Sequence, residues 1–574
     1  MPLPPASAFT VTPVFGTFRP FDTFPLRADT DQGHQRMKNA YPLPSRRTVL
    51  GTGIAAAAMA ALAACTSNPA AGPSGVTRIM PGDPMIADFE ARRAVTGKTV
   101  TTKLTAAEAD VVIAGQPVRT WGYNGALNGP IIRGTAGDKL TVSLTNKLSQ
   151  GTSVHWHGLA LRNDQDGVPG LTQQALAPAS AYDYSFVLPH PGTYWYHSHV
   201  EMQRERGLYG ALIIADPKET LSYDQEWVII LDDWMDGVTG TPDDVLKELS
   251  MGMGSMSTPA PAHSMPGMDM GGGSGSSMPG MDMGGSGSTM PPMPGMKYML
   301  MGARSDFLGG DAGDVSYPYH LFNGKAAAGP ETFPSKPGSR IRLRIINAAA
   351  DTAYRVGVPG QKITLTHTDG FPAAHQDVDA VVLGMGERID AILTVREGFT
   401  PVLALPEGKP GMAYGLVSTG TGTPPPAPAL PSTLGGTVVD GGMLKADPSV
   451  LLASKPADRV HQVHLTGGMA KYDWGINDRR FDMNNPYDGA FDLKVNERVR
   501  VDFINDTTMW HPMHLHGHTF QLAGGGARKD TVIVRPKQTV SVEFDADNPG
   551  QWLTHCHNAY HAERGMMGVF SYIK

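Results

Sequence analysis

The sequence predicts an all-β protein made of three β-sandwich domains. Its 574 residues include 68 glycines and 47 prolines, a composition that favours turn-rich β structure. Short β-rich runs recur between Gly, Pro and Asn, and the chain has no long heptad or amphipathic helical pattern. A chain of this length is expected to hold roughly two to four domains.

The formal net charge of −7 argues against a nucleic-acid-binding protein, because no basic run is found beyond the N-terminal region. The two cysteines, Cys65 and Cys556, are expected to have separate roles, so we predict no disulfide. A chain this large can bury enough apolar surface without one.

Residues 1–64 are predicted to be an N-terminal extension and an export signal that is removed. A twin arginine precedes a short Ala-rich run that ends in Leu-Ala-Ala-Cys. This order resembles a twin-arginine signal with a lipoprotein cleavage site, and the run is too short for a good membrane span. We expect a lipid on Cys65, attachment to the outer face of the cytoplasmic membrane, and a tether over residues 65–79. A buried helix is the alternative, and Met1 and Met37 are both candidate start residues.

The first domain is predicted over residues 80–216, where β-rich runs alternate with turns. It contains two histidine pairs, His155/His157 and His197/His199. Because the side chains of a strand alternate between its two faces, both imidazoles of each pair should point the same way.

The second domain is predicted over residues 217–420 and is interpreted as a spacer, because its histidines His320, His367 and His375 are isolated. It is interrupted at residues 250–302 by a low-complexity insertion with 14 of the 30 methionines of the chain. Gly, Ser and Pro are too abundant there for a packed core, so disorder is expected. Thioether sulfur is a soft ligand that selects Cu(I), so we favour a Cu(I)-binding loop over a plain linker.

A Pro- and Gly-rich linker is predicted over residues 421–454, and a third β domain over residues 455–574. This domain contains His-Pro-Met-His-Leu-His-Gly-His at residues 511–518 and His-Cys-His at residues 555–557. If the latter segment is a strand, Cys556 faces one side and both histidines face the other. One segment could then serve two metal sites, joined covalently through the cysteine.

Two kinds of copper site are therefore predicted. A thiolate, two imidazoles and a weak thioether suit a blue mononuclear site. Its ligands would be His511, Cys556, His561 and Met566, with Met567 as a rival axial ligand. The four His-X-His pairs supply eight imidazoles for a three-copper cluster between the first and third domains.

Over residues 80–574 the chain resembles the three-domain multicopper oxidases, which include laccases and bacterial cuprous oxidases of copper resistance. The resemblance rests on His-Trp-His-Gly, His-Ser-His, the octapeptide at residues 511–518, and His-Cys-His-X3-His-X4-Met. It implies Greek-key cupredoxin domains and four copper ions: one type 1, one type 2 and two type 3. Carried over by motif, the type 2 ligands are His155 and His514. The type 3 ligands are His157, His197, His199, His516, His555 and His557, whereas His518 is expected to be structural.

Two carboxylates are candidate catalytic residues for proton supply. Asp166 lies where related oxidases often carry a carboxylate that serves the cluster. The carboxylates that relatives place within or just after the His-Cys-His-X3-His segment are absent, and only Glu563 is near. For both acids the alternative is an ordinary surface carboxylate or one that stabilises the fold.

The expected function is oxidation of Cu(I) to Cu(II) coupled to four-electron reduction of O2 to water, for copper tolerance. A laccase-like oxidase of phenols or aromatic amines is the close alternative, and a copper storage or delivery protein is a more distant one. A copper nitrite reductase would need no eight-histidine cluster. We expect a monomer whose partners are O2, Cu(I) or small aromatic reductants, and the membrane.

Overall fold

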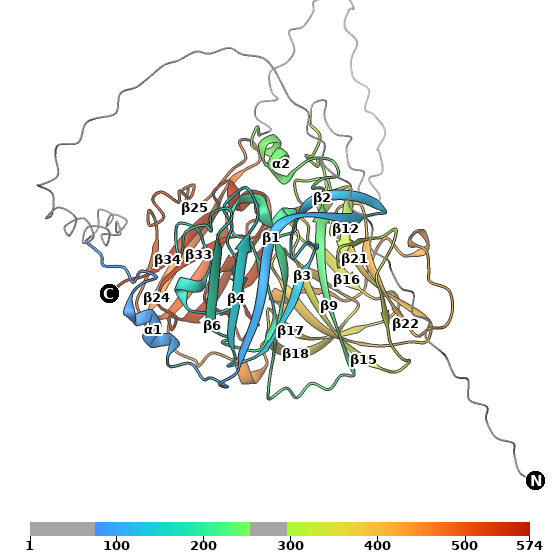
Figure 1. The fold of residues 1–574 in the computed structure, drawn as a ribbon, viewed down its shortest axis with the longest axis horizontal. Coiled ribbons are helices and arrows are strands. Elements are labelled where there is room, and N and C mark those ends of the chain that lie inside the picture. The colour runs from blue at the N-terminus through green and yellow to red at the C-terminus, as the bar shows by residue number, and fades with distance from the viewer. Residues whose placement is uncertain (1–74, 253–295) are drawn as a thin grey trace, which may run out of the picture. The chain divides into compact units, whose positions relative to one another are not determined.

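The computed structural model describes residues 75–252 and 296–574. The predicted export signal, Cys65 and the central part of the methionine-rich insertion lie outside the described residues. Strands dominate the described part, which confirms the all-β prediction (Figure 1).

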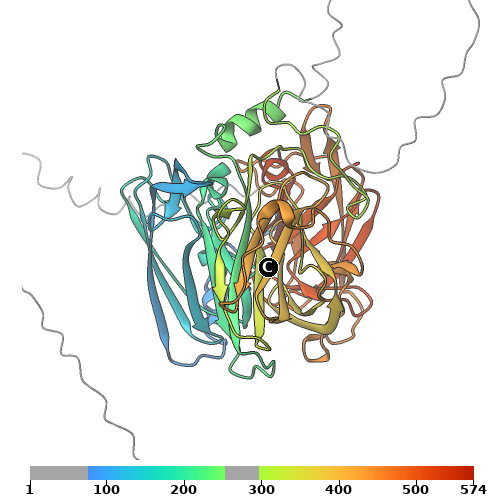
Figure 2. The same ribbon diagram turned by 90° about the vertical axis from the view of Figure 1, so that its right-hand side faces the viewer.

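The strands form six larger sheets within the described residues, and each sheet takes its strands from one of three consecutive stretches of the chain. We call these stretches the first region (residues 99–215), the middle region (residues 225–440) and the third region (residues 459–572). Figure 2 shows them by colour, with the blue-green first region and the orange-red third region on either side of the yellow-green strands.

The first region contains two four-stranded sheets, in the orders β2-β1-β4-β6 and β3-β8-β7-β5. Alternation along β4 buries Leu140, Val142 and Leu144 between the sheets, against Trp156. The strands are β1 (Thr99–Ile113), β2 (Gln116–Tyr123), β3 (Gly129–Thr135), β4 (Lys139–Asn146), β5 (His155–His157), β6 (Ala181–Val187), β7 (Gly192–His197) and β8 (Tyr209–Ala215).

The middle region contains a seven-stranded sheet, β13-β12-β9-β15-β20-β17-β18, and a six-stranded sheet, β14-β22-β21-β16-β19-β23. The predicted linker, residues 421–454, contributes β23, which pairs with β19. The strands are β9 (Gln225–Trp234), β10 (Arg304–Ser305), β11 (Gly310–Asp311), β12 (Tyr319–Phe322), β13 (Lys325–Ala326), β14 (Thr332–Pro334), β15 (Arg340–Asn347), β16 (Tyr354–Gly357), β17 (Ile363–Thr368), β18 (Phe371–Val378), β19 (Ala380–Leu383), β20 (Arg388–Thr394), β21 (Phe399–Pro406), β22 (Ala413–Ser418) and β23 (Val438–Asp440).

The third region contains a six-stranded sheet, β25-β24-β27-β32-β29-β30, and a five-stranded sheet, β26-β34-β33-β28-β31. The strands are β24 (Arg459–Gly468), β25 (Asp473–Ile476), β26 (Phe491–Leu493), β27 (Arg498–Asn505), β28 (His511–Leu515), β29 (Phe520–Leu522), β30 (Arg528–Lys529), β31 (Thr531–Val534), β32 (Thr539–Asp545), β33 (Gln551–Cys556) and β34 (Met567–Tyr572).

Helices are short. The α-helices are α1 (Pro84–Glu90), α2 (Pro242–Leu249) and α3 (Ala559–Glu563), and the 3-10 helices are η1 (Asn163–Gln165), η2 (Glu201–Arg206), η4 (Ala427–Ala429), η5 (Gly441–Met443) and η6 (Pro448–Val450). None of the helices in the described residues is long and apolar enough to cross a membrane.

Helix α2 precedes the methionine-rich insertion and forms hydrogen bonds with the residues that follow it. It begins with a capping box in which Thr241 and Asp244 satisfy each other's backbone N–H groups. Near its end, the Glu248 carboxylate accepts hydrogen bonds from the backbone N–H groups of residues 297–299 at 2.8–2.9 Å. Tyr298 and Met299 are buried, so this end of the predicted insertion belongs to the core.

Buried apolar side chains join the three regions. One hydrophobic cluster continues from the middle region, including Ile345, into the third region, including Phe503. A smaller cluster packs Trp195 of the first region against Ile230 and Ile346 of the middle region. The middle region therefore contacts both other regions and fixes their relative position.

Candidate metal centre

In the first region, both histidine pairs lie on neighbouring strands. Strand β5 pairs antiparallel with β7, and His155 stands opposite His197 in this register. Strand β7 ends at His197, so His199 lies just beyond the strand. The two motifs are thus brought together by local strand pairing.

The third region repeats this arrangement with β28 and β33, which pair so that His514 stands opposite His555 and Met513 opposite Cys556. Strand β33 ends at Cys556, one residue earlier than a His-Cys-His strand would require. His557 lies in the bend that follows, where its N–H donates to the Pro512 carbonyl at 2.7 Å.

The bend leads directly into helix α3, which carries His561. Asn558 caps this helix, because its side-chain oxygen accepts from the backbone N–H groups of Tyr560 and His561. The cap turns the chain sharply after Cys556 and returns His561 to the cysteine.

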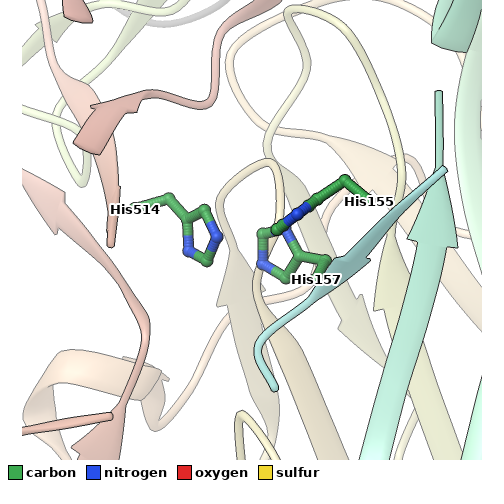
Figure 3. A group of neighbouring side chains, drawn as sticks. All are labelled: His155, His157 and His514. Carbon is green, nitrogen blue, oxygen red and sulfur yellow. The ribbon is translucent and has the colours of Figure 1, made fainter. Parts of the chain in front are cut away.

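Eight histidines from the first and third regions converge, and we call them the histidine cluster. Their ring nitrogens fall into sets lying within 4.8 Å of one another: His155, His157 and His514; His157, His197 and His557; and His199, His516 and His555. Figure 3 shows His514 facing His155 and His157 from the opposite side. His197 and His199 fall into different sets, as do His555 and His557.

The protonation pattern of the cluster suits cations. In His155, His197 and His514 the Nδ1–H donates to a backbone carbonyl at 2.8–2.9 Å, whereas the buried Nε2 has no partner. His157 is reversed, with Nε2 against Asp530 at 3.1 Å and an unpartnered Nδ1. Burying an unpartnered polar atom costs about 1–3 kcal/mol, and a bound metal would offset this cost.

A second observation comes from His516 and His555, whose Nε2 atoms lie 3.1 Å apart. His516 donates its Nδ1–H to Asp166, and His555 donates its Nδ1–H to the Cys556 carbonyl. Both Nε2 atoms therefore carry lone pairs that face each other. A cation between them removes the repulsion, so the residues fit a metal ion.

The second site, which we call the Cys556 site, consists of His511, Cys556 and His561. The Nδ1 atoms of the two histidines are 3.1 Å apart, and the Cys556 Sγ is 3.7 and 3.8 Å from them. The opposite Nε2 atoms are held by Thr507 at 2.9 Å and by Asp314 at 3.0 Å. Two imidazoles and a thiol thus point their ligand atoms at one spot.

Burial raises the pKa of the Cys556 thiol well above its usual range. A cation in the site would oppose this effect and favour the thiolate.

Met566 and Met567 occupy different surroundings. Met566 is fully buried, and its backbone bonds to Cys556 and His561 at 3.0 Å. Met567 lines a small pocket that also exposes His199 and His555. These positions favour Met566 as the methionine of the Cys556 site.

The two predicted acids have different surroundings in the structure. Asp166 is fully buried, and its carboxylate lies 3.2 Å from His155 Nδ1 and 2.9 Å from His516 Nδ1. It therefore joins a histidine of the first region to one of the third. Glu563 does not contact Asp166 but lines the small pocket described above.

The same pocket is also lined by two acids that the sequence did not single out, Glu201 and Glu205 of helix η2. Burial raises the pKa of Glu563 to about 7, and the charge of Glu201 adds to this effect. Burial also raises the pKa of Glu205 to about 7. Groups with such pKa values can take up and release protons near neutral pH.

Three other histidines among the described residues have protein partners and are not part of either site. The Nε2 of His518 forms a hydrogen bond with the Tyr572 hydroxyl at 2.7 Å, and the Nδ1 of His320 forms one with the Tyr354 hydroxyl at 2.8 Å. His367 contacts Thr366 at 3.0 Å, whereas His375 is exposed.

Sequence reasoning missed the residues that hold the ligands from a distance. Asp314 of the middle region contacts His561, and Asp530 contacts His157 across 373 positions of the chain. Arg204 lies 3.1 Å from His557. None of these residues belongs to a metal-binding motif, so only the folded arrangement reveals them.

Comparison with known proteins identifies similar chains. Three sequence profiles, each described as multicopper oxidase, match residues 105–219, 303–400 and 454–573. The chain is 42% identical to multicopper oxidase MmcO of Mycobacterium tuberculosis, covering 92% of this chain and 97% of that protein. It is 30% identical to copper resistance protein A of Escherichia coli, covering 81% and 91%.

The fold also has counterparts among solved structures. The crystal structure of Fet3p, described as a multicopper oxidase that functions in iron import, superposes with a TM-score of 0.64. The match covers 83% of this chain and 90% of that one, at 20% sequence identity.

Proposed function

Because the chain belongs to the multicopper oxidase family, we propose that it oxidises Cu(I) to Cu(II) and passes the electrons to O2. Four Cu(I) ions, four protons and one O2 would give four Cu(II) ions and two water molecules. The observation that carries the proposal is the segment 555–557, in which one cysteine and two histidines serve adjoining sites.

We assign four copper ions to the two sites. One type 1 copper would be held by His511, Cys556, His561 and Met566. A type 2 copper would be held by His155 and His514, and two type 3 coppers by the other six histidines of the cluster. Bound copper would supply the one-electron redox chemistry and the oxygen reduction.

The surroundings of the Cys556 site suit electron transfer because they keep its ligands fixed and dry. Cys556, His511 and His561 are fully buried. The rings of Trp474 and His561 lie 4.3 Å apart, which covers the His561 imidazole. The covalent path from Cys556 to His555 is short, and it is reinforced by the bond from His555 Nδ1 to the Cys556 carbonyl at 2.8 Å.

The small pocket beside the cluster supports a route for protons. Glu205 and Glu563 line it together with His199 and His555. With pKa values of about 7, both acids can exchange protons with solvent and release them toward the cluster. Glu205 would thus supply a function for which the C-terminal segment lacks the usual carboxylates. Asp166 orients His155 and His516.

The preference for Cu(I) rests on the methionine-rich insertion and on the position of its ends. Gly252 packs against the backbone of Ala470 and Lys471: a Cβ there would lie 2.6 Å from the Ala470 carbonyl oxygen. The next residue, Tyr472, donates to Asp314 at 2.7 Å, and Asp314 in turn contacts His561. The insertion therefore leaves the fold near the Cys556 site, and its thioethers can collect soft Cu(I) there.

A role in copper tolerance follows if the protein acts in the cell envelope. We propose export by the twin-arginine route and a lipid anchor on Cys65, on the basis of the N-terminal sequence. Cu(I) would then be oxidised outside the cytoplasm.

The first experiment compares O2 uptake by the copper-loaded protein with Cu(I) and with a phenol as reductant. Steady uptake with Cu(I) is expected. Bound copper without O2 consumption would instead indicate a storage or delivery protein.

The second experiment replaces the ten methionines between positions 253 and 293 by leucine, which keeps the length and apolar character of the insertion but removes the thioethers. Cu(I) oxidation at limiting Cu(I) should fall about 10-fold or more, whereas phenol oxidation should stay unchanged. An equal loss of Cu(I) oxidation and phenol oxidation, or no loss of either, would favour the laccase-like alternative.

A further inference from the structure

The middle region was expected to act only as a spacer, yet it places a buried charge against the histidine cluster. Arg388, at the start of β20, is 0% exposed. Its Nη1 and Nη2 donate to the two oxygens of Asp530 at 2.7 and 2.6 Å, a bidentate pair. Its Nε donates to the Thr193 carbonyl of β7 at 3.1 Å. One guanidinium therefore joins all three regions.

Asp530 passes this contact on to two histidines of the cluster. Its Oδ1 lies 3.1 Å from His157 Nε2 and 3.3 Å from His514 Nδ1, and its backbone carbonyl accepts from His514 Nδ1 at 2.9 Å. The two rings stack with centroids 3.8 Å apart and an interplanar angle of 13°. Asp530 thus selects which nitrogen of each ring stays free for a metal.

The backbone of Gly158 packs closely against this pair. A Cβ on Gly158, the residue after His157, would lie 2.4 Å from Arg388 Nη2 and 2.7 Å from Asp530 Oδ2. Its φ of +86° also favours glycine. The close approach of the Gly158 backbone therefore limits the positions that Arg388 and Asp530 can take.

We propose that Arg388 is a positioning residue for two copper ligands of the histidine cluster, His157 and His514, acting through Asp530. The proposal rests on the proposed function, because it assumes that copper binds there. Arg388 holds the carboxylate in the plane and charge state that keep the His157 Nδ1 and His514 Nε2 lone pairs directed at their copper ions. Without the fork, Asp530 can rotate, and both imidazoles lose their fixed orientation.

The test is Arg388→Lys in the full chain. Lysine keeps the charge but can reach only one carboxylate oxygen, so the bidentate geometry is lost. Competition with a Cu(II) chelator should show copper retention in the histidine cluster about 10-fold to 100-fold weaker. The type 2 electron paramagnetic resonance signal should decrease, whereas the visible absorption of the Cys556 site should stay.

Arg342→Lys is the matched control. Arg342 is also buried in the seven-stranded sheet and makes two bonds to one carboxylate, Asp390, at 2.9 and 2.6 Å, but neither residue contacts a cluster histidine. A purely structural role predicts that both variants lower the unfolding midpoint alike and that both retain all copper. That result would overturn the proposal.

A neutral double variant, Arg388→Met with Asp530→Asn, covers the case in which Arg388→Lys does not fold. It removes one positive and one negative charge, so the net charge of the buried group is unchanged, and Lys529 still pairs with Asp369. It should also retain cluster copper at least 10-fold more weakly than the native chain, and native retention would overturn the proposal. Failure of the native chain itself to bind copper in the cluster would refute the proposed function instead.

Discussion

The Cys556 site and the histidine cluster are built in opposite ways. The ligands of the Cys556 site come from the third region alone, from β28, β33 and the short helix α3. Asp314 of the middle region contacts one of them, His561. The cluster takes four histidines from residues 155–199 and four from residues 514–557. It also depends on the middle region, where Arg388 holds Asp530. A local strand pair can form the first site, whereas the second requires correct packing of all three regions.

The segment His555-Cys556-His557 belongs to both sites, so a substitution there tests most directly whether the two sites are independent. Cys556→Ser removes the thiolate but leaves the backbone that positions His555 and His557. We expect the strong visible absorption and the turnover to be abolished, because serine is a poor ligand for this site. Copper content should fall by one ion per chain, which elemental analysis can measure.

Retention of the other coppers is the decisive part of that experiment. If Cys556→Ser also emptied the histidine cluster, the two sites would not be independent. Retained blue colour would show that Cys556 does not hold the mononuclear copper.

A smaller effect is expected from a change in the middle region. Gly386 has φ +85°, and a Cβ there would lie 2.7 Å from His557 Cδ2 and 3.2 Å from His157 Cε1. Gly386→Ala should therefore displace these rings and cost about 1–3 kcal/mol of stability through overpacking. Copper should be lost from the cluster, measured by the type 2 and type 3 signals, while the Cys556 site keeps its absorption.

Gly360→Ala separates this effect from backbone strain. Gly360 also has a positive φ, +66°, but no atom lies within 4 Å of the Cβ position. The control should lose stability through strain alone and should retain all copper. Equal copper loss in both variants would argue against direct contact between the middle region and the cluster.

The same contrast explains how much could be predicted from the sequence. The all-β class and the family follow from composition and from four motifs, because each motif carries its ligands within a few residues. The strand pairing of β28 with β33 brings these motifs together by short-range geometry. Of residues 555–557, which were considered as one possible strand, only His555 and Cys556 belong to β33, and His557 lies in the bend before the Asn558 cap.

The supporting groups could not be predicted, for a physical reason. Arg388 and Asp530 are 142 positions apart, and His157 and Asp530 are 373 apart. Glu205 lines the small pocket because helix η2 packs against helix α3. A single buried Arg, Asp or Glu has no local pattern that distinguishes it from an ordinary structural residue, so its role depends on the tertiary fold.

The smallest predicted effect is a loss of stability at acidic pH that arises where the first and middle regions meet. His190 of the first region lies 5.1 Å from the Phe371 ring of the middle region. Its Nδ1–H donates to Tyr194 at 2.7 Å, and its Nε2 accepts from the Ala160 N–H at 3.4 Å. Burial lowers the pKa of His190 to about 3.

Because the folded pKa of His190 lies below the unfolded value of about 6.5, the unfolded chain binds the proton more readily. Stability should therefore fall as the pH decreases from about 6.5 towards 3. His190→Gln keeps a hydrogen-bonding side chain but cannot be charged. In urea unfolding of copper-free protein, the native chain should lose about 1 kcal/mol more than the variant between pH 7 and 5.5. An equal loss of unfolding free energy in the native chain and in the variant would mean that His190 does not make the junction between the regions acid-sensitive. The dependence of the histidine cluster on all three regions would then rest on packing alone.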